Sequence, residues 1–457
     1  MNAPSAPVSR HQIRLPGAVA VVVGSMIGVA VYASLGFQLA AVPGAFHIVL
    51  LWTLGAAIAF LGAVSYAELA AALPKSGGEY HFLSRIYHPG VGFLSGWISL
   101  IAGFPGPVAF AAVAFAGYLL NGLAPGWSGD GVQWTTKAIA AGLIFLVTLF
   151  HVFSLRTASR FHGWFTALKV LLLAALVGAC LWFVPQPQPV QWLPSVSDWQ
   201  AVPTDPFVTS LYYVLYAYSG WNAACYITSE VAEPQRRVPL ALLIGVGVVF
   251  VLYLALNAAF LHVAPMSAYV DPANLSTPAF VAAHAVFGGS GARVVSVLVC
   301  LGLISSVSAM TWTGPRVTQR MGQDYRMLSL LGRTNAHGVP TAGIWLQSVL
   351  AATYVFVFET PDQLVLYVTF LLQVSVFLTV LGVFVLRVRE PNLPRPYRAW
   401  GYPVTPVLFL LWEAVAMTIF LTGSHEAAKK GLATLAAGIA IYLLCRMEQH
   451  GKKSGSR

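Results

Sequence analysis

Residues 16–40 read PGAVAVVVGSMIGVAVYASLGFQLA, a run that contains no charged side chain. A helix needs about 20 apolar residues to cross the hydrocarbon core of a bilayer, so this run is long enough to cross. Its middle, Gly24-Ser-Met-Ile-Gly28, carries two glycines, which weaken a helix interior. The run therefore predicts a membrane-spanning helix that is interrupted at mid-depth.

The rest of the chain is as apolar as this first run. Hydrophobic residues make up 58% of the 457 residues and charged residues only 9%, whereas an ordinary soluble domain carries about 25% charged residues. We predict twelve membrane-spanning runs, at 16–40, 45–72, 91–121, 136–151, 161–184, 206–229, 239–264, 290–315, 340–358, 362–387, 403–422 and 430–446. The fold class expected is thus an all-α membrane protein, with residues 1–457 forming a single transmembrane domain.

The basic residues predict how the chain is oriented. Lys and Arg accumulate in the cytoplasmic loops of membrane proteins. With the amino terminus inside, 20 of the 25 basic residues fall in the tails and inner loops. We therefore expect a multi-pass protein of the cell inner membrane with both termini cytoplasmic. The net charge of +10 is spread over short clusters beside the membrane, so lipid is the expected partner and nucleic acid is not.

A second interruption is predicted in the sixth run, where Ser219-Gly220-Trp221 lies in the middle of 206–229. Transporters commonly bind substrate at the bilayer midplane between two interrupted helices at corresponding positions of two repeats. An unwound backbone exposes N–H groups that suit a carboxylate and carbonyls that suit an ammonium. An amino acid offers both groups. Each glycine taken alone also fits close helix packing.

Five motifs in this order resemble the amino acid permeases of the amino acid/polyamine/organocation (APC) superfamily, in particular the bacterial L-amino acid transporter-like branch. They are Val23-Gly-Ser-Met-Ile-Gly28; Ser65-Tyr-Ala-Glu-Leu69 with Leu73-Pro-Lys-Ser-Gly-Gly-Glu-Tyr80; Tyr216-Ala-Tyr-Ser-Gly-Trp-Asn222; Gly314-Pro-Arg-Val317; and Leu386-Arg-Val-Arg-Glu-Pro-Asn-Leu-Pro-Arg-Pro-Tyr397.

The resemblance implies a LeuT-type fold, in which helices one to five and six to ten are inverted repeats and helices one and six are discontinuous. It divides the chain into a tail (1–15), a ten-helix transport core (16–387), helices eleven and twelve with the preceding loop (388–446), and a second tail (447–457). It also implies alternating access, with no cofactor, no metal and no catalytic residue.

The resemblance also assigns the substrate site. The implied substrate-binding residues are Gly24, Ser25, Met26, Gly28, Val29, Ala30, Tyr216, Ala217 and Ser219, with Tyr216 also the outer gate. After Gly28 the family usually has Ser-Gly, and this chain has Val29-Ala30 instead. The change removes a hydroxyl donor and adds bulk, which favours a constricted pocket or an altered substrate.

Lys169 lies inside the fifth apolar run, where an ionisable group is a functional candidate by default. It lies near the start of that run, so a side chain that snorkels to the interface is an equal alternative. The resemblance favours function, because family members carry a lysine here where sodium-coupled relatives bind an ion. Ser305 and Ser306, or Ser308, are then expected to accept from it. Sodium would be unnecessary, with exchange or proton coupling left open.

The acidic residues point to the class of substrate. Helices one, three, six, eight and ten hold no acidic residue at mid-depth, which favours neutral L-amino acids. The alternative is a polyamine or organocation antiporter of the same fold. Glu68 and Glu230 are expected to be gate or structural partners of arginines, and the sequence gives Glu413 no role. No covalently linked heavy subunit is expected.

Two other classes are less favoured. A channel would need a continuous polar lining, whereas the Ser and Thr residues are scattered. A membrane enzyme would need a catalytic cluster, and the residues that come nearest to one, His151 and His162, are expected to be solvated loop residues.

Overall fold

The computed structural model describes residues 13–454 except 43, 124–130, 154–157, 201, 203, 273, 337 and 424–425. For 158–165, 197 and 450–454 it describes the backbone alone. This part of the chain is helical, and its one β contact is an isolated bridge between Ile13 and Val231. The prediction of an all-α protein is confirmed.

The elements follow one another along the chain without a second domain between them. They are α1 (Leu15–Met26), α2 (Ala30–Ala33), α3 (Leu35–Ala41), α4 (Ala45–Ala72), α5 (Gly78–Ile86), α6 (Pro89–Ile98), the π-helix η1 (Ser99–Gly103), α7 (Pro105–Leu123), α8 (Gly131–Phe153), α9 (Ala158–Trp182), α10 (Val196–Gln200), α11 (Asp205–Tyr218), the 3-10 helix η2 (Ala223–Glu230), α12 (Pro234–Val263), α13 (Met266–Val270), α14 (Pro278–Asp324), the 3-10 helix η3 (Arg326–Leu328), α15 (Thr341–Val357), α16 (Pro361–Arg389), α17 (Val404–Thr422) and α18 (Glu426–Ser454).

Nine segments in the described part of the chain are long and apolar enough to cross a membrane. They are Leu15–Ala33, Ala45–Ala72, Pro89–Leu123, Gly131–Phe153, Pro234–Val263, Pro278–Asp324, Pro361–Arg389, Val404–Thr422 and Glu426–Gln449. Two shorter apolar helices, Thr166–Trp182 and Thr341–Val357, accompany them. The chain is therefore a multi-pass membrane protein.

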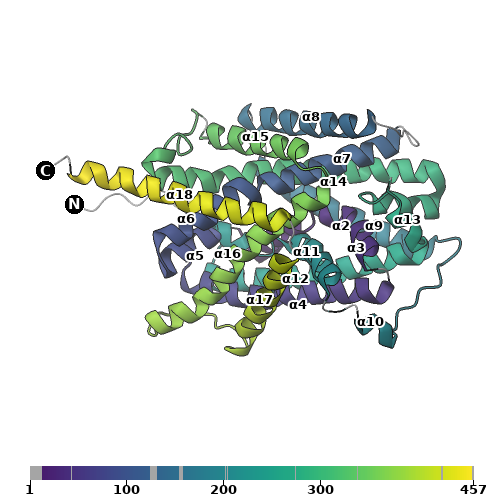
Figure 1. Ribbon diagram of the computed structural model, residues 1–457, viewed down its shortest axis with the longest axis horizontal. Coiled ribbons are helices and arrows are strands. Elements are labelled where there is room, and N and C mark those ends of the chain that lie inside the picture. Colours follow the sequence, from purple (N-terminus) through teal and green to yellow (C-terminus); the bar gives the residue numbers. More distant parts are fainter. Residues whose placement is uncertain are drawn as a thin grey trace.

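The helices pack as two groups that face each other. In one group α4 lies along α12, and α1 and α11 pack against this pair. In the other group α14 lies along α7, and α8 and α15 cover them. Helices α16, α17 and α18 close one side, and α18 extends beyond the rest of the bundle (Figure 1).

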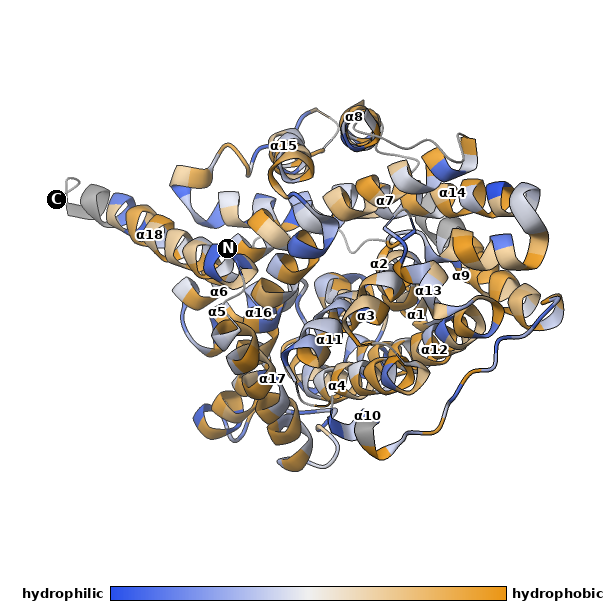
Figure 2. Ribbon diagram, turned by 45° about the vertical axis from the view of Figure 1, so that its right-hand side comes forward, coloured by the Kyte–Doolittle hydropathy of each residue, from blue (hydrophilic) through white to orange (hydrophobic). Residues whose placement is uncertain are grey.

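The outer surface of this bundle is apolar. Figure 2 shows hydrophobic residues dominating even the peripheral helices α8 and α17. Phe145 and Leu146 on α8 and Leu411 and Val415 on α17 are all more than half exposed. Exposed side chains of this kind cost free energy in water and none in hydrocarbon. The perimeter is thus built to face lipid.

Both predicted interruptions are present. Helix α1 ends at Met26, and helical geometry resumes at Ala30. Helix α11 ends at Tyr218, and the 3-10 helix η2 starts only at Ala223. Gly220 has a φ of +92°, a conformation that only glycine adopts readily, so this residue permits the second interruption.

Candidate functional site

The two interruptions lie against each other. A Cβ atom built on Gly220 would come within 2.9 Å of the Ser25 carbonyl oxygen, so only a glycine allows this approach. One hydroxyl joins the two breaks: Tyr253 on α12 donates to the Met26 carbonyl at 2.5 Å and to the Ala217 carbonyl at 3.1 Å. Tyr253 was not singled out from the sequence, although a tyrosine in the middle of an otherwise apolar run is a usable signal.

The first break leaves backbone donors without partners. The N–H groups of Val29 and Ala30 donate to no acceptor in the part of the chain that the structure describes, whereas the Gly28 N–H donates to the Met26 carbonyl. Val29 and Ala30 are both buried. Buried N–H groups cost free energy unless a partner satisfies them, so this segment is a candidate to bind an anionic group.

A cavity of about 1020 Å³ contains these groups. Its wall includes Met26–Ala30, Tyr216 and Ser219, and it extends to one end of the bundle, where it is lined by the exposed side chains of Lys75 and Arg316. We call this the Arg316 end, and the cavity is open there. Its size is that of a small-molecule binding site.

The opposite end of the cavity is closed. The buried Tyr216 ring packs edge-on against Phe110, with 5.7 Å between the centroids. Beyond it, the Tyr118 hydroxyl on α7 donates to the Tyr32 carbonyl at 2.5 Å and accepts from the Ala279 N–H at 3.2 Å. These bonds tie α2, α7 and α14 together on the side of the breaks away from the Arg316 end.

The predicted substrate-binding residues all lie at or beside the two breaks, but they differ in surroundings. Gly24 faces α9, because an added Cβ would lie 2.3 Å from the Thr166 hydroxyl oxygen, so Gly24 serves close helix packing as well as lining the cavity. An added Cβ on Gly28 would meet only the Met26 carbonyl, at 3.8 Å. Gly28 therefore has open space beside it.

Lys169 is buried and points toward the first break. Its ammonium donates to the Ser306 hydroxyl at 2.9 Å and to the Ile27 carbonyl at 3.5 Å, and the residue is 4% exposed. The lysine thus joins α9 to the break after α1 and to α14. Ser305 is buried but makes no hydrogen bond to Lys169 in the part of the chain that the structure describes, and Ser308 has another partner, His151.

The expectation of a solvated His151 is wrong. His151 is 3% exposed and lies in α8, which extends two residues beyond the predicted end of that run. Its Nε2 lies 2.8 Å from the Ser308 hydroxyl, so the histidine joins α8 to α14. The side chain of His162 lies outside the described residues.

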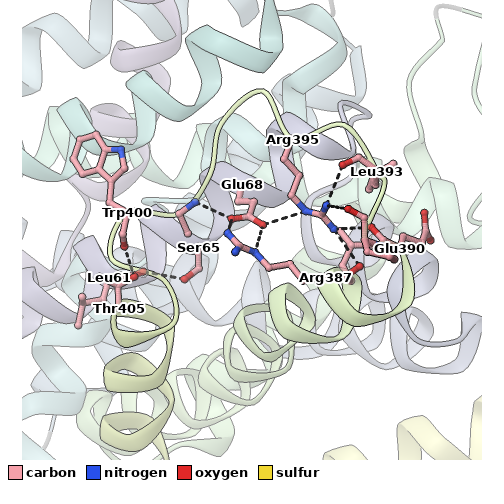
Figure 3. Close-up of polar contacts among 12 residues, drawn as sticks. Leu61, Ser65, Glu68, Arg387, Glu390, Leu393, Arg395, Trp400 and Thr405 are labelled. Atoms are coloured by element: carbon pink, nitrogen blue, oxygen red, sulfur yellow. Dashed lines mark hydrogen bonds and ion pairs between the residues drawn. The ribbon is translucent and has the colours of Figure 1, made fainter.

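Glu68 belongs to an ion-pair cluster (Figure 3). Its carboxylate accepts from Arg387 at 2.8 and 2.6 Å and from the Ala399 N–H at 2.7 Å, and Arg395 lies 3.4 Å away. Glu68 is 1% exposed. The cluster links α4 to the end of α16 and to the loop after it.

Glu230 has a looser partner. It lies 4.0 Å from Arg316, and both side chains are half exposed at the mouth of the cavity. Burial lowers the pKa of His81, which lines the same cavity, and the charges of Lys75, Arg85 and Arg320 lower it further.

Two buried carboxyls on the cavity wall have no role predicted from the sequence. Glu79 accepts from the hydroxyls of Tyr66 and Tyr226 and from the Asn222 amide, which ties α5 to the segment after the second break. The other is Glu413, on α17. The described residues contain no cluster of His, Cys, Asp or Glu that could hold a metal ion.

Comparisons with known proteins agree with this architecture. Residues 13–444 match the model of the amino acid permease family. The chain is 27% identical to the b(0,+)-type amino acid transporter 1 of Mus musculus over 90% of this chain and 83% of the relative. It is 26% identical to the large neutral amino acids transporter small subunit 2 of Oryctolagus cuniculus, covering 97% and 82% of the two chains. The Asc-type amino acid transporter 1 of Homo sapiens is 25% identical, covering 95% and 82%.

Proposed function

The chain belongs to the amino acid permease family, and on that premise we propose that it is a secondary transporter that moves neutral L-amino acids across the membrane by alternating access. The observation that carries the proposal is the cavity, in which two interrupted helices meet and the N–H groups of Val29 and Ala30 have no partner among the described residues. It is a transporter rather than an enzyme.

In this proposal the amino acid lies between the two breaks. Its carboxylate accepts from the N–H groups of Val29 and Ala30, beside Gly28, and its ammonium donates to carbonyls at the end of α11, from Tyr216 to Ser219. Tyr216 covers the substrate at the closed end. The two backbone segments provide the complementary groups that a zwitterion needs, and a neutral side chain fits the apolar remainder of the wall.

The fold proposed is the LeuT-type arrangement of twelve spans. The nine long apolar segments, the two shorter apolar helices and the interrupted segment 205–230 together make twelve. Residues 16–387 form the ten-helix core with its two inverted repeats, and 388–446 add two further helices. The positive-inside pattern supports an inner-membrane protein with both termini cytoplasmic, so that the Arg316 end, and with it the open cavity, faces the cytoplasm.

Transport is proposed to be independent of sodium. Lys169 bonds to the Ile27 carbonyl and to Ser306, which are oxygen groups of the kind that bind a cation, so its ammonium stands in for a bound sodium ion. This arrangement is compatible both with exchange and with proton-coupled uptake. We propose that the chain acts without a covalently linked heavy subunit.

The experiment is transport by the purified protein in liposomes. Labelled L-leucine, L-alanine, agmatine and putrescine are supplied in turn to vesicles preloaded with the same compound. Counterflow of leucine or alanine is expected, and the amines are expected to give none. Amine counterflow without amino acid counterflow would establish the polyamine antiporter instead. Thermal stabilisation by leucine or alanine, and not by the amines, would give an independent reading, since a ligand that binds only the folded state raises its apparent stability.

A further inference from the structure

Glu413 is a fully buried carboxyl on the wall of the transport cavity. It lies on α17 and is 0% exposed. Its Oε1 accepts from the Gln373 amide of α16 at 3.2 Å, and its Oε2 has no hydrogen-bond partner in the described part of the chain. Both Glu413 and Gln373 line the same cavity as the first break.

No cation compensates this carboxyl among the described residues. Helix α17 packs against α4, α11 and α16. From these helices the polar groups beside Glu413 are the Gln373 amide and the Tyr212 hydroxyl. The Tyr212 hydroxyl interacts with Glu413 electrostatically and has no hydrogen-bond partner in the described part of the chain. No ion pair involves Glu413 in the part of the chain described.

An isolated ionised carboxylate in such a site is far too costly to persist, and the group takes up a proton instead. In this structure the side chain is fully buried even though the cavity is open at the Arg316 end, so the protonated form is the one expected here. Release of the proton needs water at the carboxyl, and only a rearrangement of the cavity wall can bring it there.

We propose that Glu413 is the proton-carrying group of this transporter, and that it exchanges its proton only when a rearrangement of the cavity wall brings water to it. The proposal rests on the function proposed above and names its coupling ion. The proton enters from the side to which the cavity is open, stays on the carboxyl while the cavity is closed, and leaves to water on the other side. Substrate and proton then move in the same direction.

The test uses Glu413→Gln, which keeps the oxygen that accepts from Gln373 and removes the proton. Glu426→Gln is the matched control, because Glu426 is exposed and pairs with Lys429 at the surface. Both variants and the wild type are placed in sodium-free liposomes with a pH-sensitive dye inside, and uptake of labelled L-leucine and proton entry are recorded together.

The wild type and Glu426→Gln are expected to take up protons with leucine, and an inward gradient of one pH unit should drive up to about tenfold leucine accumulation at one proton per substrate. Glu413→Gln should still exchange leucine for leucine, with no proton entry and no accumulation. Gradient-driven accumulation by Glu413→Gln, or leucine uptake without proton entry in the wild type, would overturn the proposal. Agmatine binding that is lost in Glu413→Gln would overturn it too, because the carboxylate would then be a substrate-cation site.

A spectroscopic measurement tests the role of Glu413 independently of the proposed substrate class. The infrared difference between wild type and Glu413→Gln at neutral pH should contain the C=O stretching band of a protonated carboxylic acid, and the band should disappear as the pH rises. This measurement needs no substrate. Absence of leucine exchange in every variant would contradict the proposed substrate class, whereas absence of the acid band would contradict the role of Glu413.

Discussion

At the scale of single residues, chemistry at the site depends on polar groups placed in an apolar bundle. Lys169, Glu79 and Glu413 are each less than 5% exposed, and they differ in how far their hydrogen-bonding groups are satisfied. Lys169 donates to oxygens of two neighbouring segments, Glu79 accepts three hydrogen bonds, and one oxygen of Glu413 has no partner in the described chain. Glu413 has the fewest hydrogen bonds of the three, and protonation of its carboxyl is the simplest explanation of how it is tolerated there.

Removing the Lys169 ammonium should disable transport. In Lys169→Ala the Ile27 carbonyl loses its donor, and in Lys169→Arg the planar guanidinium cannot reproduce the same contacts. Loss of a charge-assisted bond of about 1.5–3 kcal/mol predicts uptake lower by about tenfold to a hundredfold. Leucine uptake in sodium, potassium and choline buffers is the measurement, with Lys137→Ala, at a partly exposed lysine of α8 outside the cavity wall, as the control. Strict sodium dependence of the wild type, or normal uptake by Lys169→Ala, would contradict the role.

Substitutions of two glycines that are four residues apart should affect different properties, one leucine binding and the other stability. Gly28→Leu places its side chain in open space beside the break, so the protein should fold normally and lose leucine binding. Gly24→Ala forces a methyl group against Thr166 and should lower stability by about 1–3 kcal/mol. Thermal unfolding and leucine binding of both variants are compared. Undiminished leucine binding by Gly28→Leu would show that the substrate does not bind beside Gly28.

At the scale of elements, the site is made by helix ends that face each other, and α12 fixes their spacing. Tyr253 supplies the bond between the two breaks. Outside the cavity wall, the ion-pair cluster around Glu68 also holds two elements together, because it joins α4 to α16. Broken helices stay ordered in an apolar environment only where neighbouring elements satisfy the freed backbone groups.

Tyr253→Phe should therefore affect function more than stability alone explains. It removes the donor to Met26 and Ala217 and is expected to cost about 1–3 kcal/mol. Tyr269→Phe is the matched control, since its buried hydroxyl donates to the Phe260 carbonyl, outside the cavity wall. Both variants should show a similar loss in melting temperature, but only Tyr253→Phe should lose leucine transport. Equal transport by the two variants would make Tyr253 merely structural.

Arg387→Ala tests the cluster that joins α4 to α16. It leaves Glu68 buried with its bidentate partner gone and is expected to cost about 3–5 kcal/mol. Arg85→Ala breaks the exposed pair with Glu390 and should cost no more than about 1 kcal/mol. Thermal unfolding of the purified variants is the measurement. A change in Arg387→Ala as small as that in Arg85→Ala would show that the cluster contributes little.

At the scale of the whole molecule, the open cavity, Ile13 and Gln449 lie at the same end of the bundle. Ile13 pairs with Glu230, which lies near Arg316, and Gln449 donates to the Asp324 carbonyl at the cavity mouth. The proposed orientation places this end in the cytoplasm. Alternating access then requires the two helix groups to rearrange so that the closed Tyr118 side opens.

The orientation can be checked with reporter fusions after residue 457. A fluorescent protein that folds only in the cytoplasm should be bright there, and an alkaline phosphatase that is active only outside should be inactive. The same pair of reporters fused in the 185–200 loop should give the reverse result. Phosphatase activity at the carboxyl terminus would show that the orientation is the opposite of the one proposed, with the open cavity facing outside.

The sequence by itself determined the fold class and the location of both interruptions. Long apolar runs can be satisfied only as helices in lipid, and glycine at mid-run marks where such a helix can open. Only the tertiary structure decided which groups meet, because contacts between segments far apart in the chain leave no local pattern. It brought Tyr253 to both breaks, buried His151 against Ser308, and placed Glu413, from a helix outside the expected core, on the cavity wall.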